Sequence, residues 1–186
     1  MCRECDCVAH DPSAGPSRRS LILGFACVAL SPALAPMASA EPAAADDERF
    51  MRIAIAEARR GVFPFGAVIV REGRIIARGR NLGRRQDDPT AHGEMVAIRQ
   101  ALARRGSRAL RGSTLYTSGE PCAMCMGAIL WCRFGRLVYA ASVEQLATKI
   151  DQIMVSSADL AAKTPFVPIT IKGGVLADEA MSLFAR

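Results

Sequence analysis

The chain has 186 residues, a length that suits one domain with an appendage. Its hydrophobic fraction of 51% is high enough for a packed core, and because aromatic residues make up 5% of the chain, that core is expected to consist mainly of Ala, Val, Ile, Leu and Met. The net charge of +6 admits a nucleic-acid partner. No block of like charges resembles a basic tail, however, so we favour ordinary solvated surface charge.

Residues 1–40 are predicted to be a leader outside the fold. A pair of arginines precedes an apolar run over residues 21–34, which is shorter than the about 20 residues that a membrane span needs. Residues 38–40 read Ala-Ser-Ala, an A-x-A cleavage pattern, and residues 17–21 resemble a twin-arginine export signal. We therefore expect a periplasmic or otherwise exported protein whose mature domain is residues 41–186. An ordinary secretory signal or an uncleaved anchor is the alternative, and a start codon assigned too far upstream would make the protein cytoplasmic.

The cysteines fall into two groups. Near the N-terminus, a small metal cluster is conceivable, but these residues precede the expected signal and have no core around them, so we favour a non-structural leader; they are Cys2, Cys5, Cys7 and His10. Beyond residue 40 three of the seven cysteines remain, namely Cys122, Cys125 and Cys132. An odd number without a distant pair argues against a disulfide framework.

The first expected element of the domain is a helix over residues 48–60, after an Ala/Pro linker. Asp46 or Asp47 is its expected N-cap, and Gly61 is expected to end it. Its apolar positions follow helical spacing, at Phe50, Ile53, Ala54 and Ala58.

A β-hairpin is expected next. Alternating apolar residues predict strands over residues 67–70 and 75–79, and Glu72-Gly73 between them suits a tight turn. The polar residues 84–90 predict a loop.

The second half of the chain is expected to alternate helices and strands. Thr90 is the expected cap of a helix that ends near Gly106 and places Met95, Ile98 and Leu102 on one face. The remaining elements are predicted as a strand over 113–118, a helix over 122–132 with Pro121 in its first turn, a strand over 136–142, a short helix over 143–150, a strand over 166–174 and a closing helix over 176–185. This alternation predicts one three-layer α/β/α domain with a mixed, mostly parallel sheet.

Two short motifs carry the chemistry. Cys122 and Cys125 stand three residues apart at an expected helix start, where unpaired N–H groups favour thiolates, so they can be two ligands of a zinc ion. Alone, this spacing also fits a redox pair or half of a structural zinc site. His92, at another expected helix start, supplies a third ligand, and three protein ligands leave a tetrahedral zinc one open position, which is typical of a catalytic site. Glu94, two residues from a ligand, is the candidate proton shuttle.

The two segments "DPTAHGEMVAIRQ" and "LYTSGEPCAMCMGAILW" closely resemble the cytidine and deoxycytidylate deaminase superfamily. The resemblance covers about residues 50–142 and is nearest to bacterial guanine deaminases, tRNA adenosine deaminases and fungal cytosine deaminases. It implies a five-stranded sheet between helices, Zn²⁺ held by His92, Cys122 and Cys125, and Glu94 as the acid–base group in hydrolysis of an amidine-type C–NH₂ to C=O. It also implies a homodimer or a higher homo-oligomer.

By the same resemblance, five further positions are expected to contact the substrate: Asn81 by its side chain, Ala67 and Gly93 by their backbones, Trp131 by a match to guanine deaminases, and Phe65 at the pocket mouth. Each has a plainer interpretation, as a turn residue for Asn81 and as core for Trp131 and Phe65.

Two departures leave the substrate open. Gly93 stands where guanine and tRNA deaminases usually have Ala, whereas fungal cytosine deaminases have Gly. Guanine deaminases also supply an acidic residue after the strand at 136–142; here Glu144 and Asp151 are possible, and we assign neither. A free base or nucleoside, with guanine first, is the favoured substrate. A tRNA wobble adenosine is the second hypothesis, supported by the net charge and by Arg104, Arg105, Arg108 and Arg111, and a non-catalytic zinc or redox module is the third.

Overall fold

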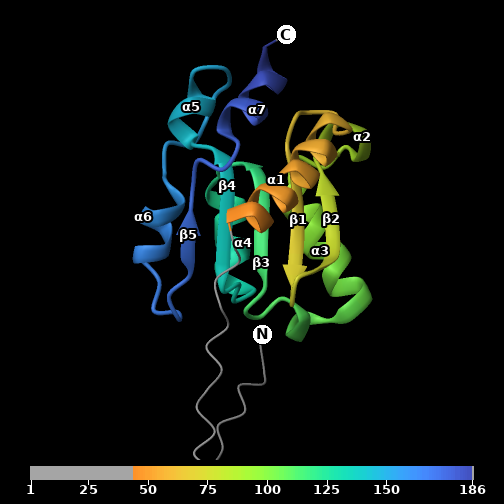
Figure 1. Ribbon diagram of the computed structural model, residues 1–186, viewed down its shortest axis with the longest axis vertical. Coiled ribbons are helices and arrows are strands. Elements are labelled where there is room, and N and C mark those ends of the chain that lie inside the picture. Colours follow the sequence, from red (N-terminus) through yellow and green to blue (C-terminus); the bar gives the residue numbers. More distant parts are fainter. Residues whose placement is uncertain (1–43, 186) are drawn as a thin grey trace, which may run out of the picture. The chain divides into compact units, whose positions relative to one another are not determined.

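The computed structural model describes residues 44–185. The chain divides into two units, Met1–Ser39 and Ala40–Arg186, and the fold described here is that of the second unit (Figure 1). The expected leader, with its cysteines and His10, lies outside the described residues. Among the helices of the described part, none is long and apolar enough to cross a membrane.

The core of the domain is a five-stranded mixed sheet in the order β2-β1-β3-β4-β5. Its strands are β1 (Gly66–Arg71), β2 (Arg74–Arg80), β3 (Thr114–Gly119), β4 (Arg136–Ala141) and β5 (Thr170–Lys172). β1 is antiparallel to both β2 and β3, whereas β3, β4 and β5 are parallel. Four of the five strands therefore point the same way and β1 is reversed among them, so the expected mixed, mostly parallel sheet is confirmed. The hairpin reverses the chain, and the crossover from β2 to β3 then places β3 on the other side of β1, so β1 opposes both neighbours.

The hairpin turn is the one that the sequence predicts. Glu72 and Gly73 both have positive φ, at 51° and 69°, which is the backbone conformation of a type I′ turn. The predicted turn is thus confirmed, and the strands on either side are each longer than expected by one residue at each end.

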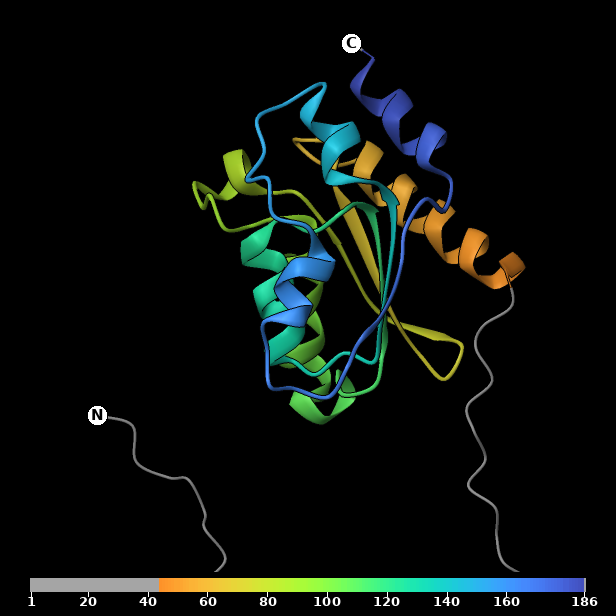
Figure 2. The same ribbon diagram turned by 90° about the vertical axis from the view of Figure 1, so that its left-hand side faces the viewer.

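Helices cover both faces of the sheet (Figure 2). One face carries α1 (Ala44–Arg59) and α7 (Ala177–Met181), and the other carries α3 (Gly93–Arg105), α4 (Ala123–Trp131) and α6 (Ser157–Ala162). Two short helices, α2 (Gly83–Gln86) and α5 (Val143–Ala147), lie past the same ends of the strands, at the top of Figure 1. Single 3₁₀ turns follow α3 and α7, over Ser107–Ala109 and Ser182–Phe184. The three-layer expectation is confirmed.

Several predicted helix boundaries differ from the observed ones. Helix α1 begins at Ala44, so Asp46 and Asp47 lie in its first turn and do not cap it. Thr90 does not cap α3, because its hydroxyl donates to Asp88 Oδ1 (2.6 Å) in the preceding turn and His92 takes the cap position. The expected apolar face of α3 was wrong at Leu102, which is 38% exposed.

Two expectations missed elements entirely. The polar loop at 84–90 contains α2, and the segment before the last strand contains α6. Both are short and have weak periodicity, so tertiary contacts decide their conformation.

Two apolar clusters flank the sheet. One lies under α3 and α4 and includes Ile69, Leu115 and Ile129, while the other lies under α1 and includes Phe50 and Val138. Side chains of consecutive strand residues alternate between these clusters, as the pleat requires.

Glycines let two helices approach the sheet closely. A Cβ added at Gly66 would lie 2.3 Å from Ala54 O in α1, and one at Gly79 would lie 2.0 Å from Gly93 O in α3. Both contacts are too short for any side chain, so these positions require glycine. The second contact seats the N-terminus of α3 directly on β2.

Candidate active site

Most of the predicted site residues lie at one edge of the sheet, the edge formed by the ends of β2, β3 and β4 and the start of β1. β3 and β4 end there together, since Gly119 is the partner of Ala141, and β1 begins there, since Ala67 is the partner of Thr117. The loops at this edge carry Phe65 and the residues after each of β2, β3 and β4. Antiparallel and parallel pairing therefore bring segments up to 75 residues apart in sequence (66 to 141) to one place.

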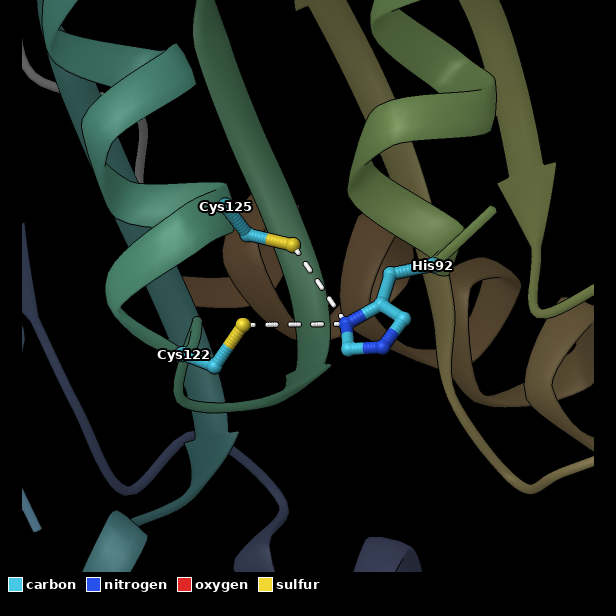
Figure 3. Close-up of side chains that lie close together, drawn as sticks. All are labelled: His92, Cys122 and Cys125. Carbon is cyan, nitrogen blue, oxygen red and sulfur yellow. Dashed lines mark hydrogen bonds between the residues drawn. The ribbon is translucent and has the colours of Figure 1, made fainter. Parts of the chain in front are cut away.

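His92 and Cys122 occupy equivalent positions on two neighbouring helices. His92 is the N-cap of α3 and Cys122 is the N-cap of α4, and neither side chain makes a capping hydrogen bond to the described residues. Both side chains instead point into the space between the helix ends, together with Cys125 from the first turn of α4 (Figure 3). Cap positions usually hold Ser, Thr, Asp or Asn, so the use of His and Cys here releases these side chains for another task.

The three side chains have the spacing of a metal site. Their ligand atoms lie within 4.8 Å of one another, and His92 Nδ1 lies 3.6 Å from the Sγ atoms of both Cys122 and Cys125 (Figure 3). Zinc bond lengths of about 2.1 Å to nitrogen and about 2.3 Å to sulfur, at a tetrahedral angle, place these atoms about 3.6 Å apart. The donor set and its spacing therefore fit a zinc ion with three protein ligands.

The two thiols differ in their protonation. A hydrogen bond from Cys125, and a further one with His92, lower the pKa of Cys122 to about 4, so Cys122 is a thiolate. The same hydrogen bond to Cys122, together with burial, raises the pKa of Cys125. The hydrogen bond with Cys122 also raises the pKa of His92. A bound divalent cation takes both sulfurs as thiolates, so the site releases a proton when it is loaded.

Glu94 lies beside the ligand cluster, inside the protein. Its side chain is 3% exposed, with Oε1 accepting a hydrogen bond from Thr117 Oγ1 (3.1 Å) and Oε2 lying 3.6 Å from Cys125 Sγ. Burial raises the pKa of Glu94 above its ordinary value. The carboxyl group is therefore placed next to the sulfur ligands and positioned by a strand residue, as a proton shuttle requires.

Thr117 was not among the predicted site residues. It is fully buried in β3 and pairs with Ala67. The sequence could have indicated Thr117, because it is two residues after Leu115 in the same strand. Its hydroxyl therefore faces α3, as the Leu115 side chain does.

Comparison with known proteins agrees with this site. Residues 44–141, more than half of the chain, match the family described as the cytidine and deoxycytidylate deaminase zinc-binding region. The chain belongs to that family. All four residues discussed above as ligands and proton shuttle lie within the matched range.

Relatives of this deaminase-family chain act on different substrates. Guanine deaminase of Bacillus subtilis (strain 168) is 48% identical over 99 residues, covering 50% of this chain and 64% of that protein. tRNA-specific adenosine deaminase of Aquifex aeolicus (strain VF5) is 41% identical over 98 residues, covering 50% of this chain and 65% of that protein. A solved structure from a study of A-to-I editing by tRNA:A34 deaminases has a TM-score of 0.63 and 34% identity, covering 73% of this chain and 98% of the other. The matches to the two curated enzymes thus span slightly less than two thirds of those proteins.

Four of the five expected substrate contacts lie at the same edge as the ligands. Asn81 follows β2 and is 8% exposed; its Oδ1 accepts from Gly83 N (3.1 Å), as the turn interpretation expects, and its amide nitrogen carries two hydrogens that this bond does not use. Ala67 is fully buried in β1 beside Thr117. The Phe65 ring packs against Phe184, with ring centroids 5.5 Å apart.

Gly93 is the fourth of these contacts and has a packing role of its own. A Cβ at this position would lie 3.1 Å from Phe65 O and 3.1 Å from Gly66 Cα. As the first residue of α3, Gly93 has a backbone N–H that the helix cannot pair. The close approach of α3 to β1 gives glycine a packing advantage here, because a Cβ would require its neighbours to shift by a few tenths of an ångström, and the departure from the usual Ala leaves the base open.

Trp131 lies elsewhere. It is the last residue of α4, nine residues after Cys122 and so about 13 Å along the helix. Its side chain is 74% exposed and packs edge-on against Phe166, with centroids 5.1 Å apart. The structure does not bring Trp131 to the ligand cluster, nor does it bury Trp131 in the core.

Proposed function

We propose that this chain is a zinc-dependent hydrolytic deaminase of a free nucleobase or nucleoside, with guanine as the first substrate to test. The reaction converts a ring C–NH₂ and water into C=O and ammonia. The observation that carries the proposal is the spacing of 3.6 Å from His92 Nδ1 to each of two cysteine sulfurs, with a buried carboxyl group next to them.

The residues of the chain have separate roles in this reaction. When bound by His92, Cys122 and Cys125, zinc supplies a Lewis acid that makes water nucleophilic near neutral pH. Glu94 removes a proton from the attacking water and delivers it to a ring nitrogen. It then takes the proton of the hydroxyl added to the ring carbon and gives it to the leaving amine, so that C=O forms and ammonia departs. Its position next to Cys125 and the bond from Thr117 keep the carboxyl group oriented for these transfers.

Substrate orientation is assigned to groups around the same edge. The unused hydrogens of the Asn81 amide can be donated to a ring nitrogen or carbonyl, and the unpaired N–H of Gly93 can be donated to a ring carbonyl. Phe65 offers an aromatic face at the rim. These are donors and an apolar surface that a flat heterocycle with carbonyl and ring nitrogen acceptors would use.

Guanine is placed first because of the similarity to the Bacillus guanine deaminase in the segment that holds these residues. A tRNA adenosine is the second candidate, supported by the tRNA-specific relatives and by exposed arginines that follow one another at the end of α3 and beyond it, namely Arg104, Arg105, Arg108 and Arg111. Cytosine is a further candidate, because the motif segments also resemble those of fungal cytosine deaminases, which have glycine at the position of Gly93.

An ammonia-release screen tests the proposal. Zinc-loaded protein is incubated with guanine, guanosine, adenine, adenosine, cytosine and cytidine, and with an anticodon stem-loop RNA. Release from guanine supports the proposal, and release from the RNA alone, with a rate that falls steeply as salt rises, supports the second candidate. No release from any of them, by protein that retains one zinc per chain, rejects both and leaves a non-catalytic zinc module.

Export and assembly remain proposals of their own. We propose that the protein is exported with cleavage after Ala40, which would leave three residues before α1 begins at Ala44. N-terminal sequencing of protein from cells tests this, and a chain beginning at Met1 would contradict it. A homodimer or a higher homo-oligomer is proposed from family resemblance, and sedimentation of the zinc-loaded protein tests it.

A further inference from the structure

Glu120 is a buried carboxylate that the roles above do not use. It lies directly after β3, two residues before Cys122, and is 5% exposed. Its backbone N–H donates to Ala141 O (2.7 Å), which continues the pairing of β3 with β4 up to the loop that carries the ligands. A carboxylate in this position is costly to bury unless both of its oxygens accept hydrogen bonds.

Both oxygens do accept, and from two different helices. Oε2 accepts from the backbone N–H of Val143 (2.9 Å), and Oε1 accepts from that of Ser157 (2.7 Å). Val143 is the first residue of α5 and Ser157 is the first residue of α6, where the helix itself cannot pair the N–H. One side chain therefore satisfies the two N–H groups that begin α5 and α6.

Helices α5 and α6 are joined by one surface loop of the chain. Residues 148–156 between them form neither helix nor strand, and Ile153 and Met154 in this loop are 61% and 58% exposed. A loop that leaves and returns at a single carboxylate is closed by that carboxylate. Glu120 thus fastens both ends of segment 143–157 to the ligand loop.

Segment 143–157 also touches a residue of the candidate substrate site. A Cβ added at Gly119 would lie 2.7 Å from Phe65 Cε1 and 3.0 Å from Leu146 Cδ1, so the side chains of Phe65 and Leu146 both pack over Gly119. Leu146 belongs to α5, and Phe65 O lies against Gly93 at the start of α3. The position of α5 therefore bears on the Phe65 ring, which the proposed function places at the rim of the site.

We propose that Glu120 is a positioning residue that ties segment 143–157 to the Cys122 loop and thereby sets the substrate-facing rim at Phe65. The part that concerns substrate binding rests on the proposed deaminase function, whereas the fastening of the segment does not. Glu120 touches neither the ligand atoms nor the reacting groups, so its loss should weaken substrate binding and leave the metal in place.

Backbone geometry makes a clean test available at Ser157. The N-cap before it, Ser156, has φ −70° and ψ 155°, a conformation that a residue before proline favours, and proline is well tolerated as the first residue of a helix. Ser157→Pro therefore removes the N–H that Glu120 accepts with little disturbance of the backbone. Ser157→Ala is the matched control, because it keeps the N–H and removes a hydroxyl that has no hydrogen-bond partner among the described residues.

A second pair of variants addresses the carboxylate itself. Glu120→Gln keeps the shape but leaves one oxygen, so it can accept from one of the two N–H groups. Glu48→Gln, at an exposed carboxylate of α1 that has no assigned role and lies outside segment 143–157, is its control.

The full-length zinc-loaded chain is examined by amide exchange in NMR, by zinc content and by steady-state kinetics with guanine as the probe. For Ser157→Pro and Glu120→Gln we expect the amides of segment 143–157 to exchange faster and KM to rise roughly 10- to 100-fold, the effect of one lost hydrogen bond to a charged acceptor, with bound zinc unchanged and a smaller change in kcat. Ser157→Ala and Glu48→Gln should match the parent chain.

Equal exchange in Ser157→Pro and Ser157→Ala would overturn the fastening role, as would loss of zinc with an unchanged segment. If Glu120→Gln fails to fold, the Ser157 pair still decides the matter. If no base is deaminated, the proposed function fails, and the exchange data test the fastening independently. Faster exchange with an unchanged KM would overturn the link from the segment to the substrate.

Discussion

Two buried carboxyl groups lie on opposite faces of the same strand. Tyr116 and Thr117 are neighbours in β3, so their side chains point to opposite sides of the sheet. The Tyr116 hydroxyl donates to Asp47 Oδ1 (2.9 Å) on the α1 side, and the Thr117 hydroxyl donates to Glu94 Oε1 (3.1 Å) on the α3 side. The two carboxyl groups are 1% and 3% exposed, yet their surroundings differ.

Asp47 is surrounded by cations. Arg136 donates to both of its oxygens (2.7 and 2.9 Å), and Lys172 donates to Oδ2 (2.8 Å). Burial alone would raise its pKa, but the hydrogen bonds from Arg136, Lys172 and Tyr116 outweigh burial and lower the pKa to about 2. Asp47 thereby joins α1 to β3, β4 and β5 as a fixed charge.

Glu94 has a neutral hydroxyl and a sulfur as its neighbours, and burial raises its pKa. A buried carboxylate that is bonded by cations stays charged, so it holds the fold together and does not take up protons easily. A buried carboxylate that is bonded only by neutral groups costs stability and exchanges its proton more readily. The comparison assigns stability to the α1 face of β3 and chemistry to the α3 face.

The sharpest test is Glu94→Gln. It removes the proton shuttle while keeping the shape of the side chain, so we expect turnover to fall about 10²- to 10⁴-fold. Bound zinc and the free energy of unfolding should stay close to those of the parent chain. Metal analysis alongside ammonia release measures both, and Cys122→Ala is the contrasting variant, which should lose zinc and activity together. Loss of zinc from Glu94→Gln would contradict the role given to Glu94.

Asp47→Asn should do the opposite of Glu94→Gln: it should lower stability and leave turnover unchanged. It removes the negative charge that pairs with Arg136, whose side chain is 8% exposed, and removing one member of a buried ion pair typically costs about 3–5 kcal/mol. We expect a loss of that size in the free energy of unfolding, measured with urea, and unchanged zinc content and kcat in the folded protein. A loss below about 1 kcal/mol would show that the network is not the anchor of α1.

The pH dependence of stability reports the same group. The pKa of Asp47 is lowered from 3.8 to about 2 in the folded chain, so its contribution is fully present above pH 3.8 and is lost as pH falls toward 2. At about 1.4 kcal/mol per pKa unit, this amounts to about 2.5 kcal/mol. Urea unfolding between pH 5 and pH 2 should show this loss in the parent chain and not in Asp47→Asn. Parallel curves for the two proteins would rule it out.

The smallest loss of stability is expected at Lys172. Comparing Lys172 with Arg136 shows how much each of the two cations that bond Asp47 contributes. The Lys172 side chain is 43% exposed, so Lys172→Met should cost about 1 kcal/mol or less. Arg136→Met, at the buried partner, should cost several times more. Equal losses in urea unfolding would mean that exposure does not distinguish the two cations.

Much of the fold followed from local patterns. The hairpin was predictable because Glu72-Gly73 suits positive φ at both central residues, and the helix starts at His92 and Cys122 were approximately located because Gly, Pro and polar residues precede them. The capping residues of α1 and α3 were nevertheless misjudged, and for one reason. Asp47 and Thr90 are good caps in isolation, but distant or neighbouring side chains, Arg136 for the first and Asp88 for the second, engage them differently.

The candidate site divides in the same way. Residue types and spacing were enough to select the candidate metal ligands and the candidate acid–base residue, which the structure brings together, because few combinations of Cys, His and Glu suit that chemistry. Trp131 and Glu120 could not be judged from the sequence. A residue nine positions along a helix is distant from the site in space although it lies in the same motif, and a carboxylate before Pro121 has meaning only through the two N–H groups that reach it from residues 143 and 157.

The sequence by itself determined the ligand set, the layered α/β architecture and the tight turn, since each of these depends on the chemistry of a few residues close together along the chain. Tertiary structure decided the orientation of β1 between two antiparallel neighbours, the opposite pKa shifts of two buried carboxyl groups and the fastening of segment 143–157. These depend on which strands pair and on which face each side chain takes, and strand register is set by contacts among residues far apart in the sequence.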